Sequence, residues 1–196
     1  DLVGSTALAQ KLDPEELRDL MQAYQHACGR IIERYDGHIA QYLGDGLMVY
    51  FGWPHAHEDD AQRAVRAGLD MIEAIQVLQT AFELSARVGI ATGPVVVGDT
   101  RGDRRTDAGL AVGETPNLAA RIQGIAGVNT VVIADATRRL VGGAFDLEPL
   151  GAQILKGIDG VVTLNRVVGD ASAEDRFEAR IVGGLTPFVG REHEIG

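Results

Sequence analysis

The sequence predicts an α+β fold in which helices cover a β-sheet. Apolar residues recur every three or four positions in several stretches, as on one face of an amphipathic helix, and short apolar runs bounded by glycine or proline indicate strands. The two kinds of segment follow one another irregularly and include hairpins, which favours an α+β arrangement. Of the 196 residues, 45% are apolar and 23% are charged, which is typical of a globular domain and excludes a disordered chain.

The first clear helix is marked most strongly at its start. Asp13 can cap it, Pro14 suits the first helical position, and Glu15-Glu16 place negative charge at the positive end of the helix dipole. The apolar residues that follow at steps of three and four are Leu17, Leu20, Met21, Tyr24, Cys28, Ile31, Ile32 and Tyr35. Asp36-Gly37 is expected to end the helix.

A hairpin and a second helix come next. Residues 38–43 and 47–51 are predicted to form two strands, joined by the tight turn Gly44-Asp45-Gly46. The helix is expected to begin near Asp59-Asp60. Its apolar face comprises Ala61, Ala64, Val65, Gly68, Ile72 and Ile75.

The second half of the sequence predicts shorter elements. In order, they are a strand pair at 84–91 and 95–97 around the breaker Thr92-Gly93-Pro94, a polar loop at 98–109, a helix at 115–123, a strand at 131–133, a helix at 135–140, and a closing strand pair at 145–155 and 161–168. The helix at 115–123 begins with Thr115-Pro116-Asn117, a capping residue followed by proline.

The composition changes at about residue 169. An acidic, weakly apolar stretch at 170–175 precedes a new apolar pattern at 186–192. We therefore expect a domain at 1–168 and, at 169–196, a linker into a further domain. The first residues have neither an initiator Met nor the basic region of a signal peptide, so the sequence is interpreted as a fragment of a longer chain.

Charge and cysteine content narrow the classes of partner. Lys and Arg total 18 against 28 Asp and Glu, a net charge of −10, which disfavours nucleic acid and anionic lipid as partners. The apolar runs are too short to predict insertion into a membrane. The single cysteine, Cys28, excludes an intrachain disulfide and a cysteine-based zinc site, and we expect a cytoplasmic location.

Three groups of polar residues could carry chemistry. Asp1 and Asp45 are expected at neighbouring strand ends, where two carboxylates could hold divalent cations, although Asp45-Gly46 is also an ordinary hairpin turn. Asn117 and Arg121 are four apart on one helical face and could hold a ribose and a phosphate oxygen, or simply face solvent. Lys156, beside a glycine, is a cation that could equally be an ordinary surface lysine.

Five segments, taken in order, resemble the catalytic domain of class III nucleotidyl cyclases, the adenylate and guanylate cyclase family. They are Asp1-Leu2-Val3-Gly4-Ser5-Thr6, Tyr42-Leu43-Gly44-Asp45-Gly46, Arg87-Val88-Gly89-Ile90-Ala91-Thr92-Gly93, the segment from Val112 to Arg121, and Leu155-Lys156-Gly157. Each is short, but all five occur in the right order with compatible spacing across residues 1 to about 168. The later Phe188-Val189-Gly190-Arg191-Glu192 looks like the start of an ATPase-type signalling module.

The resemblance implies a ferredoxin-like βαββαβ core with extra strands and helices, working as a homodimer whose active sites lie between two subunits. It implies that Asp1 and Asp45 hold two magnesium or manganese ions per site, with the Leu2 carbonyl nearby. In the family, the partner subunit supplies the residues that match Asn117, which would orient the ribose, and Arg121 and Lys156, which would stabilise charge developing on the phosphates.

The resemblance also implies how the triphosphate is bound. Backbone amides around Gly4, Ser5 and Thr6, at a helix start, would cradle phosphates. An arginine of the loop at 98–109, either Arg104 or Arg105, would reach the terminal phosphates.

Base recognition departs from the family pattern. Gln41 stands where adenylate cyclases typically have Lys and guanylate cyclases have Glu. Leu110 stands where adenylate cyclases have Asp or Thr and guanylate cyclases have Cys. Gln41 can donate and accept hydrogen bonds, whereas Leu110 can do neither.

The function that the resemblance implies is conversion of a nucleoside triphosphate, ATP, to 3′,5′-cyclic AMP and pyrophosphate in cyclic-nucleotide signalling. Two alternatives stay open: a catalytically weak or inactive cyclase-like domain that dimerises or senses nucleotide, and a guanylate cyclase. A plain ferredoxin-like interaction module would leave the matching polar residues unexplained.

Overall fold

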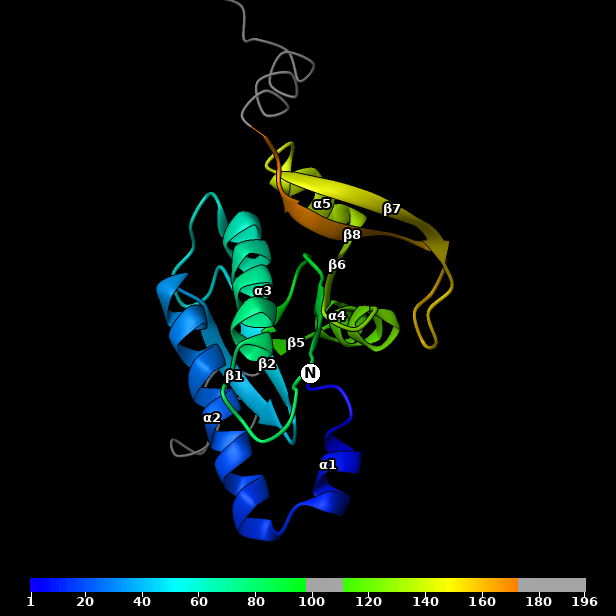
Figure 1. The fold of residues 1–196 in the computed structure, drawn as a ribbon. Coiled ribbons are helices and arrows are strands. Elements are labelled where there is room, and N and C mark those ends of the chain that lie inside the picture. Colours follow the sequence, from blue (N-terminus) through cyan, green and yellow to red (C-terminus); the bar gives the residue numbers. More distant parts are fainter. Residues whose placement is uncertain (98–110, 173–196) are drawn as a thin grey trace, which may run out of the picture.

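The computed structural model describes residues 1–97 and 111–172. Its helices are α1 (Ser5–Lys11), α2 (Pro14–Arg34), α3 (Asp60–Gln76), α4 (Glu114–Ile125) and α5 (Asp135–Val141). Its strands are β1 (His38–Leu43), β2 (Gly46–Tyr50), β3 (Arg87–Ile90), β4 (Val96–Val97), β5 (Ala111–Val112), β6 (Thr130–Ala134), β7 (Phe145–Gln153) and β8 (Val162–Asp170). The predicted α+β class is confirmed (Figure 1).

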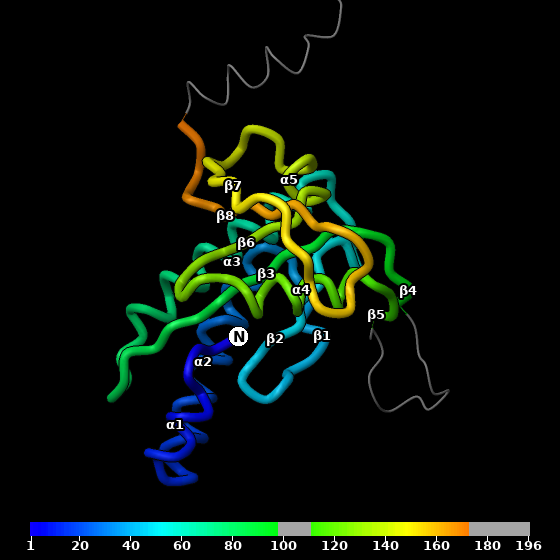
Figure 2. The backbone as a smooth tube through the Cα atoms, turned by 90° about the vertical axis from the view of Figure 1, so that its right-hand side faces the viewer, coloured from blue at the N-terminus to red at the C-terminus, as the bar shows by residue number. Residues whose placement is uncertain are grey.

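The start of the chain completes a ferredoxin-like core. Leu2 forms an antiparallel bridge with Ala86, just before β3, and its amide donates to the Asp45 carbonyl, just before β2, over 3.3 Å. The N-terminal residues thus lie between β2 and β3 at the centre of the molecule (Figure 1; Figure 2). With this short segment as the first strand, the order of strands and helices through α2, β1, β2, α3 and β3 is βαββαβ.

The N-terminal signals of α2 act as the sequence predicts. The Asp13 side chain accepts hydrogen bonds from the amides of Glu15 and Glu16, at 2.9 and 2.8 Å. The Glu16 carboxylate in turn accepts from the Asp13 amide at 3.1 Å, which completes a capping box. These bonds satisfy amides that have no partner within the helix, so they stabilise the start of α2 at the residues where the sequence predicts it.

Helices cover both faces of the second sheet, which has the strand order β3-β6-β8-β7. β6 is buried on both sides because its residues alternate between the two faces. Val131 and Ile133 pack in a cluster with residues of α3 and α5, whereas Val132 and Ala134 pack with residues of α4. This sandwich holds α4 against β3 and β6.

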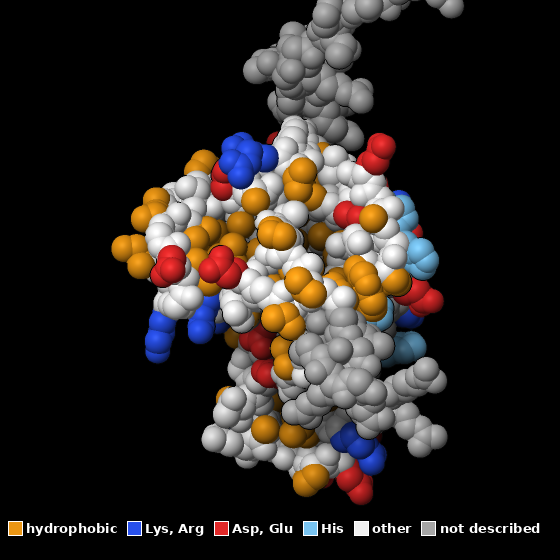
Figure 3. Space-filling model, turned by 180° about the vertical axis from the view of Figure 1, so that it is seen from behind, with side chains coloured by type: hydrophobic (Ala, Val, Ile, Leu, Met, Phe, Trp, Pro, Cys, Tyr) orange, Lys and Arg blue, Asp and Glu red, His pale blue; other side chains and the backbone are white. Residues whose placement is uncertain are grey.

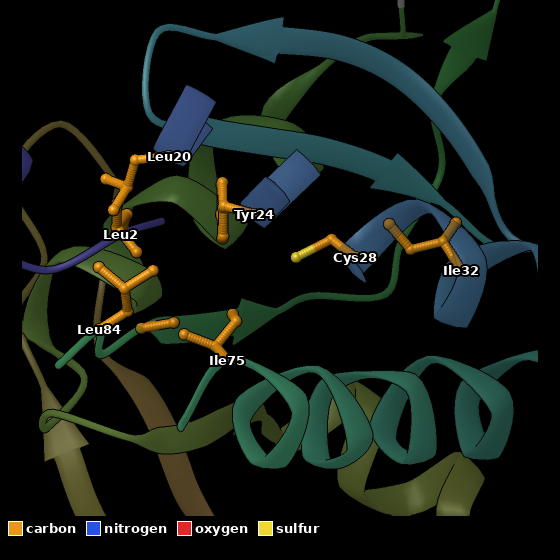
Figure 4. Packing of buried hydrophobic residues seen from close by; sticks show 8 residues of the cluster. Leu2, Leu20, Tyr24, Cys28, Ile32, Ile75 and Leu84 are labelled. Carbon is orange, nitrogen blue, oxygen red and sulfur yellow. The ribbon is translucent and has the colours of Figure 1, made fainter. Parts of the chain in front are cut away.

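A separate core lies beneath the first hairpin. Leu2, only 1% exposed, packs with Leu20, Tyr24 and Cys28 of α2 and with Leu84 (Figure 4). The side chains of α2, α3 and the N-terminal segment point toward one another there. Burial of Leu2 therefore anchors the residue beside it, Asp1.

The structure corrects one predicted strand pair. The segments expected at 84–91 and 95–97 do not pair with each other: β3 pairs in parallel with β6, and β4 pairs with β5. The intervening Thr92-Gly93-Pro94 carries the chain from one sheet to another. The expected closing pair is confirmed as β7 and β8, which are antiparallel.

The start of α4 differs slightly from the prediction. α4 begins one residue earlier than expected, with Gly113 as its N-cap, and the Thr115 hydroxyl donates to the Pro94 carbonyl instead of capping the helix.

Among the described helices, none combines the length and the apolar character that a membrane crossing requires. The linker expected at 169–196 stays a prediction, since residues 173–196 lie outside the described ranges.

Candidate active site

The backbone brings Asp1 and Asp45 to the same edge of the core. Asp1 is fixed by β3, because the Arg87 amide donates to the Asp1 carbonyl over 2.9 Å. Asp45 follows Gly44, whose φ of +64° makes the tight turn between β1 and β2. The bond from the Leu2 amide to the Asp45 carbonyl then ties these two segments together.

Each carboxylate has a neutral hydrogen-bond donor on one of its oxygens. Gln123 Nε2, on α4, donates to Asp1 Oδ2 over 2.9 Å. The Ser5 hydroxyl donates to Asp45 Oδ2. Asp1 Oδ1 lies on the side of the β1–β2 turn, 3.4 Å from where a Cβ on Gly46 would stand. Both aspartates are half-buried.

These residues have the chemistry of a site for hard divalent cations. Carboxylate oxygens, with a backbone carbonyl nearby, are the ligands that Mg²⁺ and Mn²⁺ prefer. Within the described residues, no Lys, Arg or His side chain forms an ion pair with Asp1 or Asp45, so the two negative charges have no side-chain counter-ion there. The same residues contain no cluster of three or more His, Cys, Asp or Glu side chains. The site thus depends on two carboxylates.

Gly4, Ser5 and Thr6 form the turn into α1. Gly4 has a φ of +74° and its carbonyl accepts from the amides of Ala7 and Leu8. The Ser5 hydroxyl already bonds Asp45. The helix start that the resemblance implies is therefore present, next to the two aspartates.

Asn117 and Arg121 lie on an exposed face of α4. Neither side chain has a hydrogen bond or ion pair with the parts of the chain that the structure describes. Lys156, equally exposed, follows Leu155 in the connection from β7 to β8. Leu155 is buried in one cluster with Ile122 of α4.

The packing of Leu155 therefore keeps Lys156 close to α4. The outer parts of this connection and of the two strands carry exposed apolar residues, namely Leu150, Ile154, Val161 and Val168. In the view from behind, hydrophobic side chains gather on the side where β7 and β8 lie (Figure 3).

The two groups of predicted site residues are not bonded to each other within the described chain. No hydrogen bond or ion pair between described residues joins Asp1 or Asp45 to Asn117, Arg121 or Lys156. Instead α4 presents Gln123 toward Asp1 and presents Asn117 and Arg121 to solvent. Sequence reasoning did not single out Gln123, because a helical glutamine has no distinctive pattern.

A cavity of about 630 Å³ separates the first hairpin from α4. Its lining is mostly apolar and includes Asp1, Met48 of β2, Gly89 of β3, and Thr115 and Gln123 of α4. Such a largely apolar, preformed hollow with a few polar groups is typical of a ligand site or an interface.

The predicted base-reading and loop residues are placed only in part. Gln41 lies in β1, exposed, where the pairing with β2 shifts register between Ile39 and Gln41. Leu110, Arg104 and Arg105 lie outside the described residues, so their roles stay predictions.

Comparison with known proteins identifies the domain. The family model of the adenylate and guanylate cyclase catalytic domain matches residues 1–165. Adenylate cyclase 1 of Rhizobium meliloti is 28% identical over 189 residues, which cover 91% of this chain and 28% of that protein. The chain spans between 19% and 40% of the length of the curated relatives matched first.

Solved structures agree with this match. The adenylyl cyclase CyaB from P. aeruginosa has a TM-score of 0.81 and 30% identity, over 89% of this chain and 92% of that one. The guanylyl cyclase Cya2 has a TM-score of 0.82 and 29% identity, over 88% of this chain and 90% of that one. The chain belongs to the family of class III adenylate and guanylate cyclase catalytic domains.

Proposed function

We propose that the domain converts ATP to 3′,5′-cyclic AMP and pyrophosphate, as a homodimer that binds two divalent metal ions at each active site. The observation that carries this proposal is the adjacency of Asp1 and Asp45, each with a hydrogen bond to one carboxylate oxygen and neither with a side-chain counter-ion in the described chain. A turn and a buried strand end hold them, so the pair is formed before any ligand arrives.

The metals and the triphosphate would share this edge of the core. Asp1 and Asp45 would hold Mg²⁺ or Mn²⁺, with the Leu2 carbonyl as a further oxygen ligand. When bound, such ions favour ionisation of the attacking 3′-hydroxyl and neutralise charge on the triphosphate and the leaving pyrophosphate. The amides of Gly4, Ser5 and Thr6, at the turn into α1 where the Ser5 hydroxyl bonds Asp45, would bind phosphate oxygens.

Asn117, Arg121 and Lys156 would act on the site of the partner subunit. Their exposure and their lack of bonds within the described chain leave them available for such contacts. Asn117 would orient the ribose, while Arg121 and Lys156 would stabilise the charge that develops on the transferred phosphorus centre. Arg104 or Arg105 would bind the terminal phosphates.

Phosphoryl transfer of this kind gains most of its rate from positioning and charge neutralisation. The α4 face of one subunit would position the ribose hydroxyl, and both subunits would neutralise phosphate charge, one through its metal ions and the other through Arg121 and Lys156. The cavity between the first hairpin and α4, lined largely by apolar groups, supports burial of this surface against a second copy of the chain.

Product analysis tests the proposal. The purified protein is incubated separately with ATP and GTP, with Mg²⁺ or Mn²⁺, and cyclic products are resolved by chromatography. We expect cyclic AMP from ATP at the higher rate. A faster yield of cyclic GMP would make the domain a guanylate cyclase, and no cyclic product from either nucleotide would favour a dimerisation or nucleotide-sensing role.

A further inference from the structure

Gln123 lies on the inner side of α4 and reaches the carboxylate proposed to bind metal. We propose that Gln123 is a positioning residue that orients Asp1 so that its Oδ1 atom remains available to a metal ion; this inference rests on the proposed function. The amide of Gln123 donates to Asp1 Oδ2 over 2.9 Å, across 122 positions of sequence. The other carboxylate oxygen, Asp1 Oδ1, lies 3.4 Å from where a Cβ on Gly46 would stand, beside the turn that carries Asp45.

The geometry of this contact is fixed by close packing of α4 on β3. A Cβ on Gly89 of β3 would stand 2.3 Å from the backbone nitrogen of Gln123 and 2.5 Å from the backbone oxygen of Ala119. Only glycine therefore lets the two backbones approach this closely. Ile122, the residue before Gln123, is fully buried, which prevents rotation of the helix.

Asp1 is held by the same strand, β3. The Arg87 amide, at the first residue of β3, donates to the Asp1 carbonyl over 2.9 Å. Both partners of the Gln123–Asp1 hydrogen bond are thus held by β3, one through α4 and one through the N-terminal segment. The bond joins two groups that the fold has already positioned, so little side-chain freedom is lost in forming it.

The uncharged nature of Gln123 also fits this role. An amide donor orients a carboxylate while leaving its negative charge for a cation, whereas Lys or Arg at this place would neutralise that charge and compete with the metal. Outer residues that hydrogen-bond a metal ligand typically contribute 10- to 100-fold in metal affinity. Gln123 has the position and the chemistry of such a residue.

The test measures binding of Mn²⁺ alone, by the electron paramagnetic resonance signal of the free ion during titration. Gln123→Met removes the donor with little change in volume, and we expect it to weaken Mn²⁺ binding about 10- to 100-fold. Gln76→Met is the matched control: Gln76 is exposed at the end of α3, and its side chain has no hydrogen bond with other described residues. The control should bind Mn²⁺ as the wild type does.

A second variant separates orientation of Asp1 from simple support of the fold. Gln123→Lys keeps a donor within reach of Asp1 but adds a positive charge, so we expect metal-free thermal stability at least equal to that of the wild type and Mn²⁺ binding weaker than in Gln123→Met. If Gln123→Met fails to fold, Gln123→Ala, which also removes the donor, takes its place. Wild-type Mn²⁺ affinity in either folded variant would overturn the inference.

Asp1→Ala distinguishes failure of the inference from failure of the proposed function. If Asp1→Ala loses Mn²⁺ binding while both Gln123 variants keep it, the metal site stands and the positioning role of Gln123 is wrong. If Asp1→Ala binds Mn²⁺ as the wild type does, the proposed metal site is wrong and the role of Gln123 is wrong with it.

Discussion

The edge of the core that carries Asp1 and Asp45 differs sharply from the outer face of α4. At the core edge, both carboxylates are half-buried and hydrogen-bonded, and a buried leucine anchors the segment. On the outer face of α4, Asn117 and Arg121 are exposed and have no side-chain partner in the described chain. One chain therefore completes the proposed metal-binding half of the site and leaves the other half open. This contrast supports the proposal that a second subunit completes it.

The largest expected effect comes from the core edge. Asp45→Ala removes a proposed metal ligand, and we expect cyclase activity to fall about 10³-fold or more, which corresponds to at least about 4 kcal/mol of transition-state stabilisation. Since Asp45 lies in a turn and is half-buried, the melting temperature should change little. Asp19→Ala, at an exposed aspartate of α2, is the control and should retain activity. Full activity of Asp45→Ala would show that the metal site is elsewhere.

Mixing two inactive variants tests whether the contrast reflects two subunits. Asp45→Ala and Arg121→Ala chains, each inactive alone, are combined under conditions that exchange subunits. Activity should recover to roughly a quarter of the wild-type value, because about half of the dimers are mixed and one of the two sites in each is intact. No recovery, despite mixed dimers demonstrated by affinity co-purification of two differently tagged chains, would place Arg121 and Asp45 in the same subunit's site.

Base selectivity concerns Gln41 of β1 and Leu110, the positions that the resemblance assigns to base recognition. Leu110 has no polar group for the wrong base to leave unpaired, and the Gln41 amide can face a donor or an acceptor, so we expect only a modest preference for ATP over GTP. Gln41→Lys should raise the ratio of kcat/KM for ATP to that for GTP about tenfold, and adding Leu110→Asp should raise it about 100-fold. Wild-type discrimination of about 10⁴ or more, roughly 5.5 kcal/mol, would mean that other residues read the base.

Gly89 of β3 and Gly124 of α4 are a matched pair of glycines for testing how closely α4 packs on β3. Gly89→Ala forces a Cβ to within 2.3 Å of backbone atoms of α4, so we expect it to lower the free energy of unfolding by about 2 kcal/mol or more. Gly124→Ala lies in α4 with nothing within 4 Å of its Cβ and should raise that free energy by up to about 1 kcal/mol. Urea denaturation measures both. Similar stabilities of the two variants would contradict the close packing of α4 on β3.

Sequence reasoning predicted the local elements better than their partners. The start of α2 and the β1–β2 hairpin were predictable because Asp13-Pro14 and Gly44-Asp45-Gly46 determine the local backbone. The pairing of β3 was wrong because its partner, β6, lies 40 residues further on and nothing near Thr92-Gly93-Pro94 distinguishes a hairpin from a crossing between sheets. Local signals do not specify which distant strand a short apolar run will join.

The proposed site shows the same limit. The order of the five segments that carry the family resemblance pointed to Asp1 and Asp45, and the structure brings these two residues together. Gln123 could not be predicted, because its contact with Asp1 depends on the close approach of α4 to β3 at Gly89. That approach is a property of packing, and a single glycine in a strand pattern does not reveal what packs against it.

The last expected effect concerns the pH dependence of stability, which depends on the core beneath the anchored edge. Burial raises the pKa of the Cys28 thiol to about 11, and Cys28 is only 1% exposed. The ordinary thiol pKa is about 8.5, so between about pH 8.5 and 11 the folded protein keeps the proton that the unfolded chain releases. This contribution to stability is complete below about pH 8.5 and is lost as the pH rises toward 11. The free energy of unfolding should therefore fall with rising pH, by up to about 2 kcal/mol between pH 8.5 and 10. Cys28→Ala should be less stable at pH 7, because it leaves a small cavity, yet its free energy of unfolding should decline less steeply between pH 8.5 and 10.

The comparison stops at pH 10 because burial also raises the pKa of Tyr24, whose ordinary value lies there. Urea denaturation of both proteins at half-unit pH intervals measures the two slopes. Equal slopes would mean that the thiol ionises alike in the folded and unfolded chains, and that Leu2 and Asp1 rest on a core more open to water than the packing of Cys28 implies.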